Sequence, residues 1–226
     1  MPDRGAATDP VAVKICGLSE PVSLKAAVDA GARYVGLVFF PPSPRYLEAQ
    51  AAAELCANIP PHVSKVGLVV DPTDAELDAL RAAVPLDFLQ LQGAESPARV
   101  AQVKARYGLP VMKAVGVAEA GDLRAVETYA QVADQLLIDA KPPKGSDLPG
   151  GNGVSFDWDL LTALSIPVPW LLAGGLTAAN VAEAIRRTGA RQVDVSSGVE
   201  SSKGVKGPQL IRAFVEAAHA PLVVAD

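Results

Sequence analysis

Residues 11–40 read VAVKICGLSEPVSLKAAVDAGARYVGLVFF, and this stretch contains the unit from which the rest of the chain is built. Two short apolar runs, at 11–16 and 34–40, enclose a segment rich in Ala, Val and Leu that has the composition of a helix. A continuous apolar run followed by a helix is typical of a strand that is buried on both faces of a parallel sheet. The stretch therefore predicts a strand, a helix and a second, parallel strand.

The same unit recurs along the chain. Six further apolar runs lie at residues 64–70, 88–92, 111–117, 135–139, 170–173 and 192–195. Eight strand–helix units in 226 residues predict an α/β fold, a single (β/α)8 TIM barrel, whose usual length is about 250 residues. An open doubly wound sheet is the alternative, but no Gly-x-Gly-x-x-Gly fingerprint follows the first run. We expect the barrel to span residues 11–218, between a disordered lead-in at 1–10 and a C-terminal tail at 219–226.

The expected helices are bounded by residues that favour helix ends. Candidate N-caps, which have short polar side chains, are Ser19, Asp71, Ser96 and Thr177. Candidate C-terminal stops, which tolerate a left-handed backbone, are Gly31, Gly108 and Gly189. These signals place the helices between the apolar runs, as a barrel requires.

Composition excludes several classes of function. The chain has 25 acidic and 20 basic residues and a net charge of −5, which argues against a nucleic-acid partner. Every apolar run is shorter than the roughly 20 residues that a membrane span needs. The two Cys, without an export signal, favour free thiols in the cytoplasm. The two His, His62 and His219, lie away from the expected strand ends, so we expect no metal site and no Ser–His nucleophile.

Two residues at strand ends are candidates for acid–base chemistry, because TIM-barrel active sites lie where the strands end. Cys16 ends the first run, although a free Cys is as often a small buried hydrophobe. Asp139 ends the sixth run, where a buried acid is costly unless it is paired or functional. The alternative for Asp139 is an ion pair, for which the available lysines are Lys14, Lys113 and Lys141. The Gly-rich stretch at 145–153 follows, and its position favours a lid over a plain loop.

Other strand ends offer groups that bind anions. Three prolines precede Arg45 and restrict its direction, which suits capture of a carboxylate, whereas a solvent-facing Arg is the alternative. Small residues follow the last two runs, and loops of this kind after strands 7 and 8 commonly bind phosphate in this fold. They are Gly174, Gly175, Ser197 and Gly198. A pair of tight turns is the alternative interpretation.

Taken in order and spacing, these motifs resemble the phosphoribosylanthranilate isomerase family, whose members are TIM-barrel enzymes of tryptophan biosynthesis. The resemblance covers residues 13–218 and includes KICG at 14–17, SPR at 43–45, LQLQG at 89–93, LID at 137–139, FDW at 156–158, AGGL at 173–176 and DVSSGVE at 194–200. It implies an Amadori rearrangement of N-(5-phosphoribosyl)anthranilate to 1-(2-carboxyphenylamino)-1-deoxyribulose 5-phosphate. It also implies a small-molecule substrate and no metal or organic cofactor.

The resemblance implies roles for particular residues. Asp139 would be the general acid that opens the ribose ring, and Cys16 the general base that removes the C2 proton. Arg45 would bind the anthranilate carboxylate, and Asp194 would position the sugar or support the phosphate loop. The phosphate would be held by Gly174, Gly175, Ser197 and Gly198. Gln92 stands where the family usually has His, and an amide keeps hydrogen bonding but cannot titrate.

Two points stay open at the level of sequence. Cys16 needs a neighbour that stabilises its thiolate, and Lys14 is close along the chain, although strand alternation could turn it away. The sequence also does not choose between a monomer and a homodimer.

Rival functions differ in the groups they require. Indole-glycerol-phosphate synthase would use a catalytic lysine, for which Lys113 is available. The barrel isomerase of a histidine precursor would have an acid in place of Cys16. A non-catalytic barrel that binds a phosphorylated metabolite is favoured mildly by Gln92.

Overall fold

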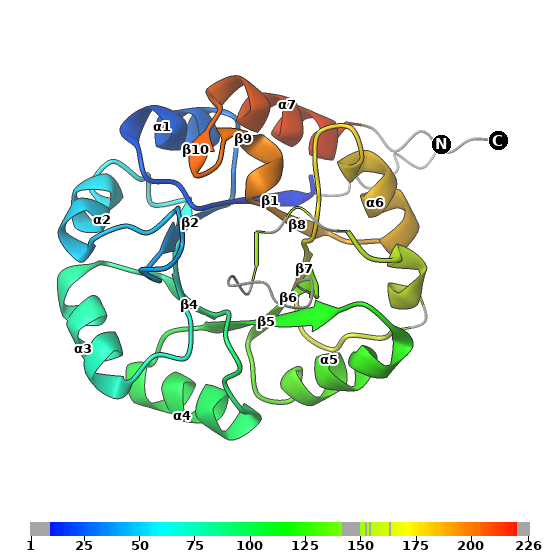
Figure 1. The fold of residues 1–226 in the computed structure, drawn as a ribbon, viewed down its shortest axis with the longest axis horizontal. Coiled ribbons are helices and arrows are strands. Elements are labelled where there is room, and N and C mark those ends of the chain that lie inside the picture. The colour runs from blue at the N-terminus through cyan, green and yellow to red at the C-terminus, as the bar shows by residue number, and fades with distance from the viewer. Residues whose placement is uncertain (1–9, 142–149, 152, 154, 163, 221–226) are drawn as a thin grey trace, which may run out of the picture.

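The computed structural model describes residues 10–141, 150–151, 153, 155–162 and 164–220. Eight parallel strands form a closed barrel in the order in which they occur in the chain, and helices surround it (Figure 1). The strands are β1 (Ala12–Cys16), β2 (Tyr34–Val38), β3 (Ser64–Val69), β4 (Phe88–Leu91), β5 (Val111–Val117), β6 (Gln135–Ala140), β7 (Trp170–Leu172) and β8 (Gln192–Val195). The predicted TIM barrel is therefore confirmed, and the open doubly wound sheet is wrong.

The helices lie outside the barrel. The α-helices are α1 (Pro21–Asp29), α2 (Ala49–Cys56), α3 (Asp74–Ala83), α4 (Pro97–Tyr107), α5 (Leu123–Tyr129), α6 (Val181–Thr188) and α7 (Pro208–His219). Short 3-10 helices are η1 (Ala120–Asp122), η2 (Trp158–Leu161) and η3 (Ser197–Val199). Between β6 and β7, the described residues contain η2 where the repeat predicts an α-helix. Helix α7 continues through His219, one residue into the expected C-terminal tail.

The helix ends follow the predicted signals in part. Ser96 caps α4 by accepting a hydrogen bond from the backbone N–H of Arg99, and Gly108 and Gly189 end α4 and α6 in the left-handed conformation, as predicted. Gly31 also has a positive φ, one residue beyond the C-cap of α1.

Three predicted N-caps are wrong. Helix α1 is preceded by Glu20 instead of Ser19, and α6 by Asn180 instead of Thr177. Helix α3 begins after Thr73, whose capping box with Glu76 satisfies the first turn better than Asp71 could from two residues upstream.

Alternation along the strands divides the side chains into two layers. In β1, Val13 and Ile15 face the helices and join the main hydrophobic core, whereas Lys14 and Cys16 face the barrel interior. Part of the interior is filled by a separate apolar cluster of Met112, Ala114, Leu137, Leu171 and Ala173. Polar interior side chains lie at both ends of the strands: Gln135 and Gln192 pair at the amino ends, and Cys16, Gln90 and Asp139 line a cavity at the carboxyl ends. No described helix is long and apolar enough to cross a membrane.

Candidate active site

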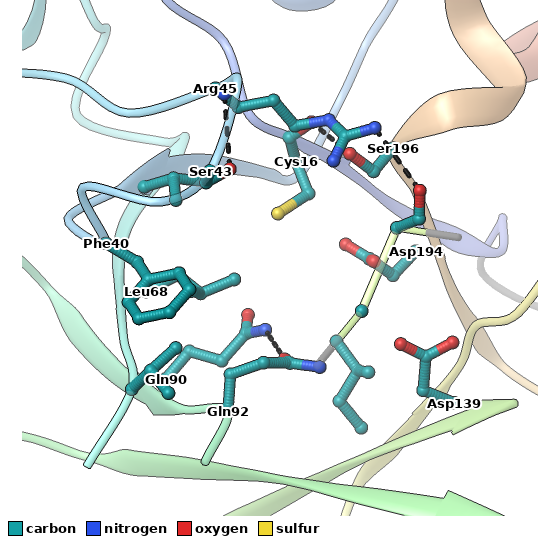
Figure 2. Close-up of a pocket in the computed structure, with 15 residues that line it drawn as sticks. Cys16, Phe40, Ser43, Arg45, Leu68, Gln90, Gln92, Asp139, Asp194 and Ser196 are labelled. Carbon is teal, nitrogen blue, oxygen red and sulfur yellow. Dashed lines mark hydrogen bonds between the residues drawn. The ribbon is translucent and has the colours of Figure 1, made fainter. Parts of the chain in front are cut away.

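A cavity opens at the carboxyl ends of the strands, and its wall combines five of the residues predicted from the sequence (Figure 2). They are Cys16, Arg45, Gln92, Asp139 and Asp194. A second cavity adjoins it, shares Asp139 and Asp194, and is lined by the four predicted phosphate-binding residues Gly174, Gly175, Ser197 and Gly198. The structure therefore brings every predicted site residue into one composite site.

Lys14 lies beside both Cys16 and Asp194 and interacts with each of them. It is fully buried, and its Nζ lies 2.7 Å from Oδ1 of Asp194 on the neighbouring strand β8. Burial alone would lower the pKa of Lys14, but Asp194 and Cys16 outweigh it, so that the pKa is raised and the ammonium form is favoured. Because Lys14 and Cys16 are two residues apart on β1, both face inward, and strand alternation does not turn Lys14 away from the thiol.

The Cys16 thiol is buried beside this ammonium. A Cβ built on Gly36 would lie 3.0 Å from Sγ of Cys16 and 3.2 Å from Nζ of Lys14, so both atoms border the space that this glycine leaves. Burial raises the pKa of the Cys16 thiol, while hydrogen bonding and charge from Lys14 and the charge of Lys206 oppose the rise. The thiol thus has a cationic partner for its deprotonated form, which answers the question that the sequence leaves open.

Asp139 is suited to carry a proton near neutral pH. Burial raises the pKa of Asp139 to about 7, and the nearby carboxylate of Asp194 adds to the rise. A hydrogen bond of 2.8 Å from the backbone N–H of Ala140, the charge of Lys14 and the side-chain amide of Gln92 oppose it. A carboxyl group that is half-protonated near pH 7 can serve as a general acid.

The alternative that Asp139 serves a structural ion pair is not supported. Each of the three candidate lysines has another carboxylate partner: Lys14 pairs with Asp194, Lys113 with Glu95 and Lys141 with Asp122. Within the part of the chain that the structure describes, Asp139 belongs to no ion pair.

Lys113 faces away from the cavity and secures the loop after β4. Its Nζ donates to the backbone carbonyls of Leu91 (3.1 Å) and Gly93 (2.8 Å) and lies 2.9 Å from Oε2 of Glu95. An ammonium group has three donors, and all three are used here. The structure therefore provides no support for Lys113 as the catalytic lysine of a synthase.

Arg45 is buried and points along the cavity wall. Its Nε lies 2.6 Å from Oε1 of Glu200, and its Nη2 donates to Oε2 of Glu200 at 3.2 Å and to the carbonyl of Gly151 at 3.3 Å. Lys206 also contacts Glu200, at 2.8 Å. Within the described residues, Nη1 of Arg45 has no protein partner. The alternative of a solvent-facing Arg45 is therefore wrong.

The second cavity depends on close backbone approaches. A Cβ on Gly198 would lie 1.9 Å from the carbonyl oxygen of Leu176, and one on Gly174, which has φ +88°, would lie 2.7 Å from the backbone nitrogen of Ala140. Only glycine permits these contacts, which join the loops after β7 and β8 to each other and to the end of β6. Gly174 and Gly198 are consequently required to form the cavity.

The sequence did not single out several other polar residues of the site, among them Ser43 and Ser196, which line the first cavity. Gln90 lies in the cavity wall, and the period of two along β4 could have indicated it from Gln92. Glu200 and Lys206 belong to a small antiparallel sheet of β9 (Glu200–Ser202) and β10 (Val205–Lys206), which follows β8 and η3 in the chain. Arg45 and Glu200 are 155 residues apart, so no local pattern could have predicted their pairing.

Parts of the predicted lid, lead-in and tail are not among the residues that the structure describes. Most of the predicted lid at 145–153, residues 1–9 of the lead-in and residues 221–226 of the tail lie outside the described residues. Gly150, at the end of the lid segment, is described, and a Cβ on it would lie 3.1 Å from Oδ2 of Asp139. Across the described ranges, no group of three or more His, Cys, Asp or Glu could hold a metal ion.

Comparison with known proteins identifies the family. A family model described as N-(5'phosphoribosyl)anthranilate (PRA) isomerase matches residues 13–217. The N-(5'-phosphoribosyl)anthranilate isomerase of Paracoccus denitrificans is 65% identical over 213 residues, covering 94% of this chain and 99% of that protein. The crystal structure of phosphoribosyl anthranilate isomerase from Thermotoga maritima has a TM-score of 0.82 at 34% identity, covering 92% of this chain and 98% of that chain. A crystal structure of the isomerase in complex with reduced 1-(o-carboxyphenylamino)-1-deoxyribulose 5-phosphate has a TM-score of 0.78 at 32% identity, covering 92% of this chain and 98% of that chain. This chain therefore belongs to the N-(5'-phosphoribosyl)anthranilate isomerase family.

Proposed function

We propose that this chain converts N-(5'-phosphoribosyl)anthranilate to 1-(2-carboxyphenylamino)-1-deoxyribulose 5-phosphate, with Asp139 as general acid and Cys16 as general base. One observation carries the assignment of roles. A carboxyl group with a pKa of about 7 and a thiol beside a buried ammonium face the same cavity from strands β6 and β1 (Figure 2). A proton donor and a group that can accept a proton, on different sides of one cavity, suit an acid–base isomerisation.

The steps balance in protons. Neutral Asp139 donates a proton to the ribose ring oxygen, the C1–O bond breaks, and a protonated Schiff base forms with the anthranilate nitrogen. The Cys16 thiolate then removes the proton from C2, and the electron pair neutralises the Schiff base to give an enolamine. Ketonisation, in which O2 loses a proton and C1 gains one, restores the protonated acid and the free base. The Lys14 ammonium stabilises the thiolate before the proton transfer.

The two adjoining cavities suit the two ends of this substrate. Val38, Phe40 and Leu68 give the first cavity an apolar wall that suits an aromatic ring, and Arg45 lies beside it. Gly174, Gly175, Ser197 and Gly198 line the second cavity and are assigned to the phosphate. Asp194 borders both cavities, which is the position of the sugar in a substrate that spans them.

Turnover of the freshly generated substrate tests the activity. Purified protein should abolish the anthranilate-type fluorescence of phosphoribosylanthranilate and form the ketose phosphate. Binding without loss of fluorescence would instead favour the non-catalytic barrel.

We further propose a cytoplasmic location, because the free thiols of Cys16 and Cys56 suit a reducing compartment. A relative from Thermotoga maritima is described as dimeric, so sedimentation should decide between monomer and homodimer for this chain.

Arg45→Ala is expected to raise KM by at least about tenfold, because a charge-assisted hydrogen bond to a ligand carboxylate is lost. Glu200 already occupies Nε and Nη2, so we assign the ligand carboxylate to Nη1. Arg45→Lys keeps the charge but lacks this arrangement and should show an intermediate KM. Steady-state kinetics and thermal unfolding together check the prediction. An unchanged KM in a folded Arg45→Ala protein would mean that the carboxylate binds elsewhere.

A further inference from the structure

Gln90 is a polar side chain of the active-site cavity to which the mechanism assigns no role. It lies on the inner face of β4, is 1% exposed and lines the cavity together with Gln92. Its Nε2 donates a hydrogen bond of 2.6 Å to Oε1 of Gln92. Its Oε1 has no partner among the described residues, a condition shared there by one other buried side-chain atom, Nε1 of Trp158.

The hydrogen bond between the two amides sets their orientation, with Oε1 of Gln92 facing Gln90. Nε2 of Gln92 lies on the side of Asp139, since a Cβ built on Gly150 would lie 2.7 Å from this nitrogen and 3.1 Å from Oδ2 of Asp139. An oxygen in that position must accept, which requires the Gln90 nitrogen to donate and turns the Gln90 oxygen away. Figure 2 shows this oxygen turned toward the open centre of the cavity, on the side of Cys16. A buried hydrogen-bond acceptor without a partner in the described part of the chain therefore borders the cavity.

The surroundings of this acceptor select the donor that would satisfy it. Phe40 and Leu68 provide apolar surface near Gln90, whereas the polar second cavity lies beyond Asp139 and Asp194. The substrate would place its aromatic ring on the apolar wall and its phosphate in the second cavity. The bond that joins the ring to the sugar would then lie between the apolar wall and the second cavity, near Gln90. The donor at that junction is the arylamino N–H.

We propose that Oε1 of Gln90 accepts a hydrogen bond from the N–H that joins the anthranilate ring to the sugar, an inference that rests on the proposed function. Buried acceptors lose hydration, so a ligand donor that satisfies this oxygen contributes to binding. The bond strengthens when the nitrogen becomes the cationic N–H of the Schiff base, because charge-assisted hydrogen bonds are stronger than neutral ones. Gln90 therefore contributes to kcat as well as to KM.

A pair of product analogues tests this contact. One is the reduced product, which has the arylamino N–H, and the other has an ether oxygen in place of that nitrogen. The parent protein should bind the amine at least about tenfold more tightly than the ether, measured by calorimetry. Gln90→Met removes the acceptor at similar volume, and Gln90→Asn withdraws it by one methylene. Both variants should lose this discrimination and show a lower kcat.

Gln135→Met is the matched control. Gln135 is a buried glutamine of the barrel interior that donates to Gln192 and does not line the cavity. This variant should keep the preference for the amine. Equal weakening of both analogues by the Gln90 substitutions would overturn the proposal, because it would show that Gln90 only positions Gln92. Failure of the parent protein to bind either analogue would instead contradict the proposed function itself.

Discussion

Cys16→Ala is expected to lower kcat/KM by at least about a hundredfold, because the variant lacks the group that removes the C2 proton. The Lys14 ammonium next to Sγ stabilises a thiolate, and no other described thiol lines the cavity. Cys16→Ser should be nearly as inactive, since a serine hydroxyl is too weak an acid to supply an anionic base at neutral pH. Steady-state kinetics with freshly generated substrate measures both variants.

Cys56→Ala provides the matched control for Cys16. Cys56 is also a buried free cysteine, but it lies in α2 and is packed in the hydrophobic core. Its replacement should leave kcat/KM near the parent value, while alkylation of the parent protein at Cys16 should abolish activity. A folded Cys16→Ala protein with activity close to that of the parent would show that another group is the base.

Asp139→Asn is expected to lower kcat/KM by a similar factor of at least about a hundred, because an amide cannot protonate the ribose ring oxygen. The substitution keeps an acceptor for the backbone N–H of Ala140, which limits structural change. Asp134→Asn is the matched control, since Asp134 accepts a comparable backbone hydrogen bond from Val111 but does not line the cavity. That variant should remain active. Near-parent turnover by Asp139→Asn would exclude Asp139 as the acid.

The same substitution should stabilise the fold at alkaline pH. Because the pKa of Asp139 is raised to about 7 in the folded protein and is about 3.9 in an unfolded chain, the folded state resists ionisation. Ionisation of Asp139 therefore lowers the free energy of unfolding. This destabilisation is fully present above pH 7 and disappears as the pH falls below about 4. Asp139→Asn should therefore raise the free energy of unfolding above pH 7, with a gain that shrinks in acid. Denaturant unfolding of the parent and the variant, above pH 7 and below about pH 4, measures this gain. A lower free energy of unfolding for the variant at alkaline pH would contradict the prediction.

The pH dependence of kcat/KM follows from the two proposed catalytic groups. The active form has a neutral Asp139 and a Cys16 thiolate, and the pKa of Cys16 is raised above its usual value by burial. As pH rises to about 7, where Asp139 titrates, the thiolate fraction grows and so does kcat/KM. Above that pH, loss of the acid cancels the gain in thiolate, so a plateau is expected until the thiol titrates. In Asp139→Asn, the rise should continue to the pKa of the thiol. A fall of the parent profile directly above pH 7 would show that the base titrates below the acid.

Local sequence patterns predicted the strands and the strand ends at which the candidate catalytic residues lie. Cys16 and Asp139 stand out because each ends an apolar run, and a barrel brings the ends of all its strands together. The period of two along β1 also predicts that Lys14 lies on the same face as Cys16. The ion pair of Lys14 with Asp194 on β8 depends on how the two strands meet in the fold. The misassigned helix caps, such as Asp71, show the limit of single-residue signals when a better cap follows two residues later.

The sequence by itself determined the barrel, the strand-end positions of the site and the small residues that form the second cavity. These features depend on periodicity and on residue size, which neighbouring residues in the chain display. Only the tertiary structure decided the partners: Asp194 for Lys14, Glu200 for Arg45, and the two glutamines beside Asp139. It also decided the raised pKa of Asp139, because burial and the nearness of Asp194 arise only when β6 and β8 close around one cavity. Electrostatic effects depend on distances through space, and a linear sequence does not contain those distances.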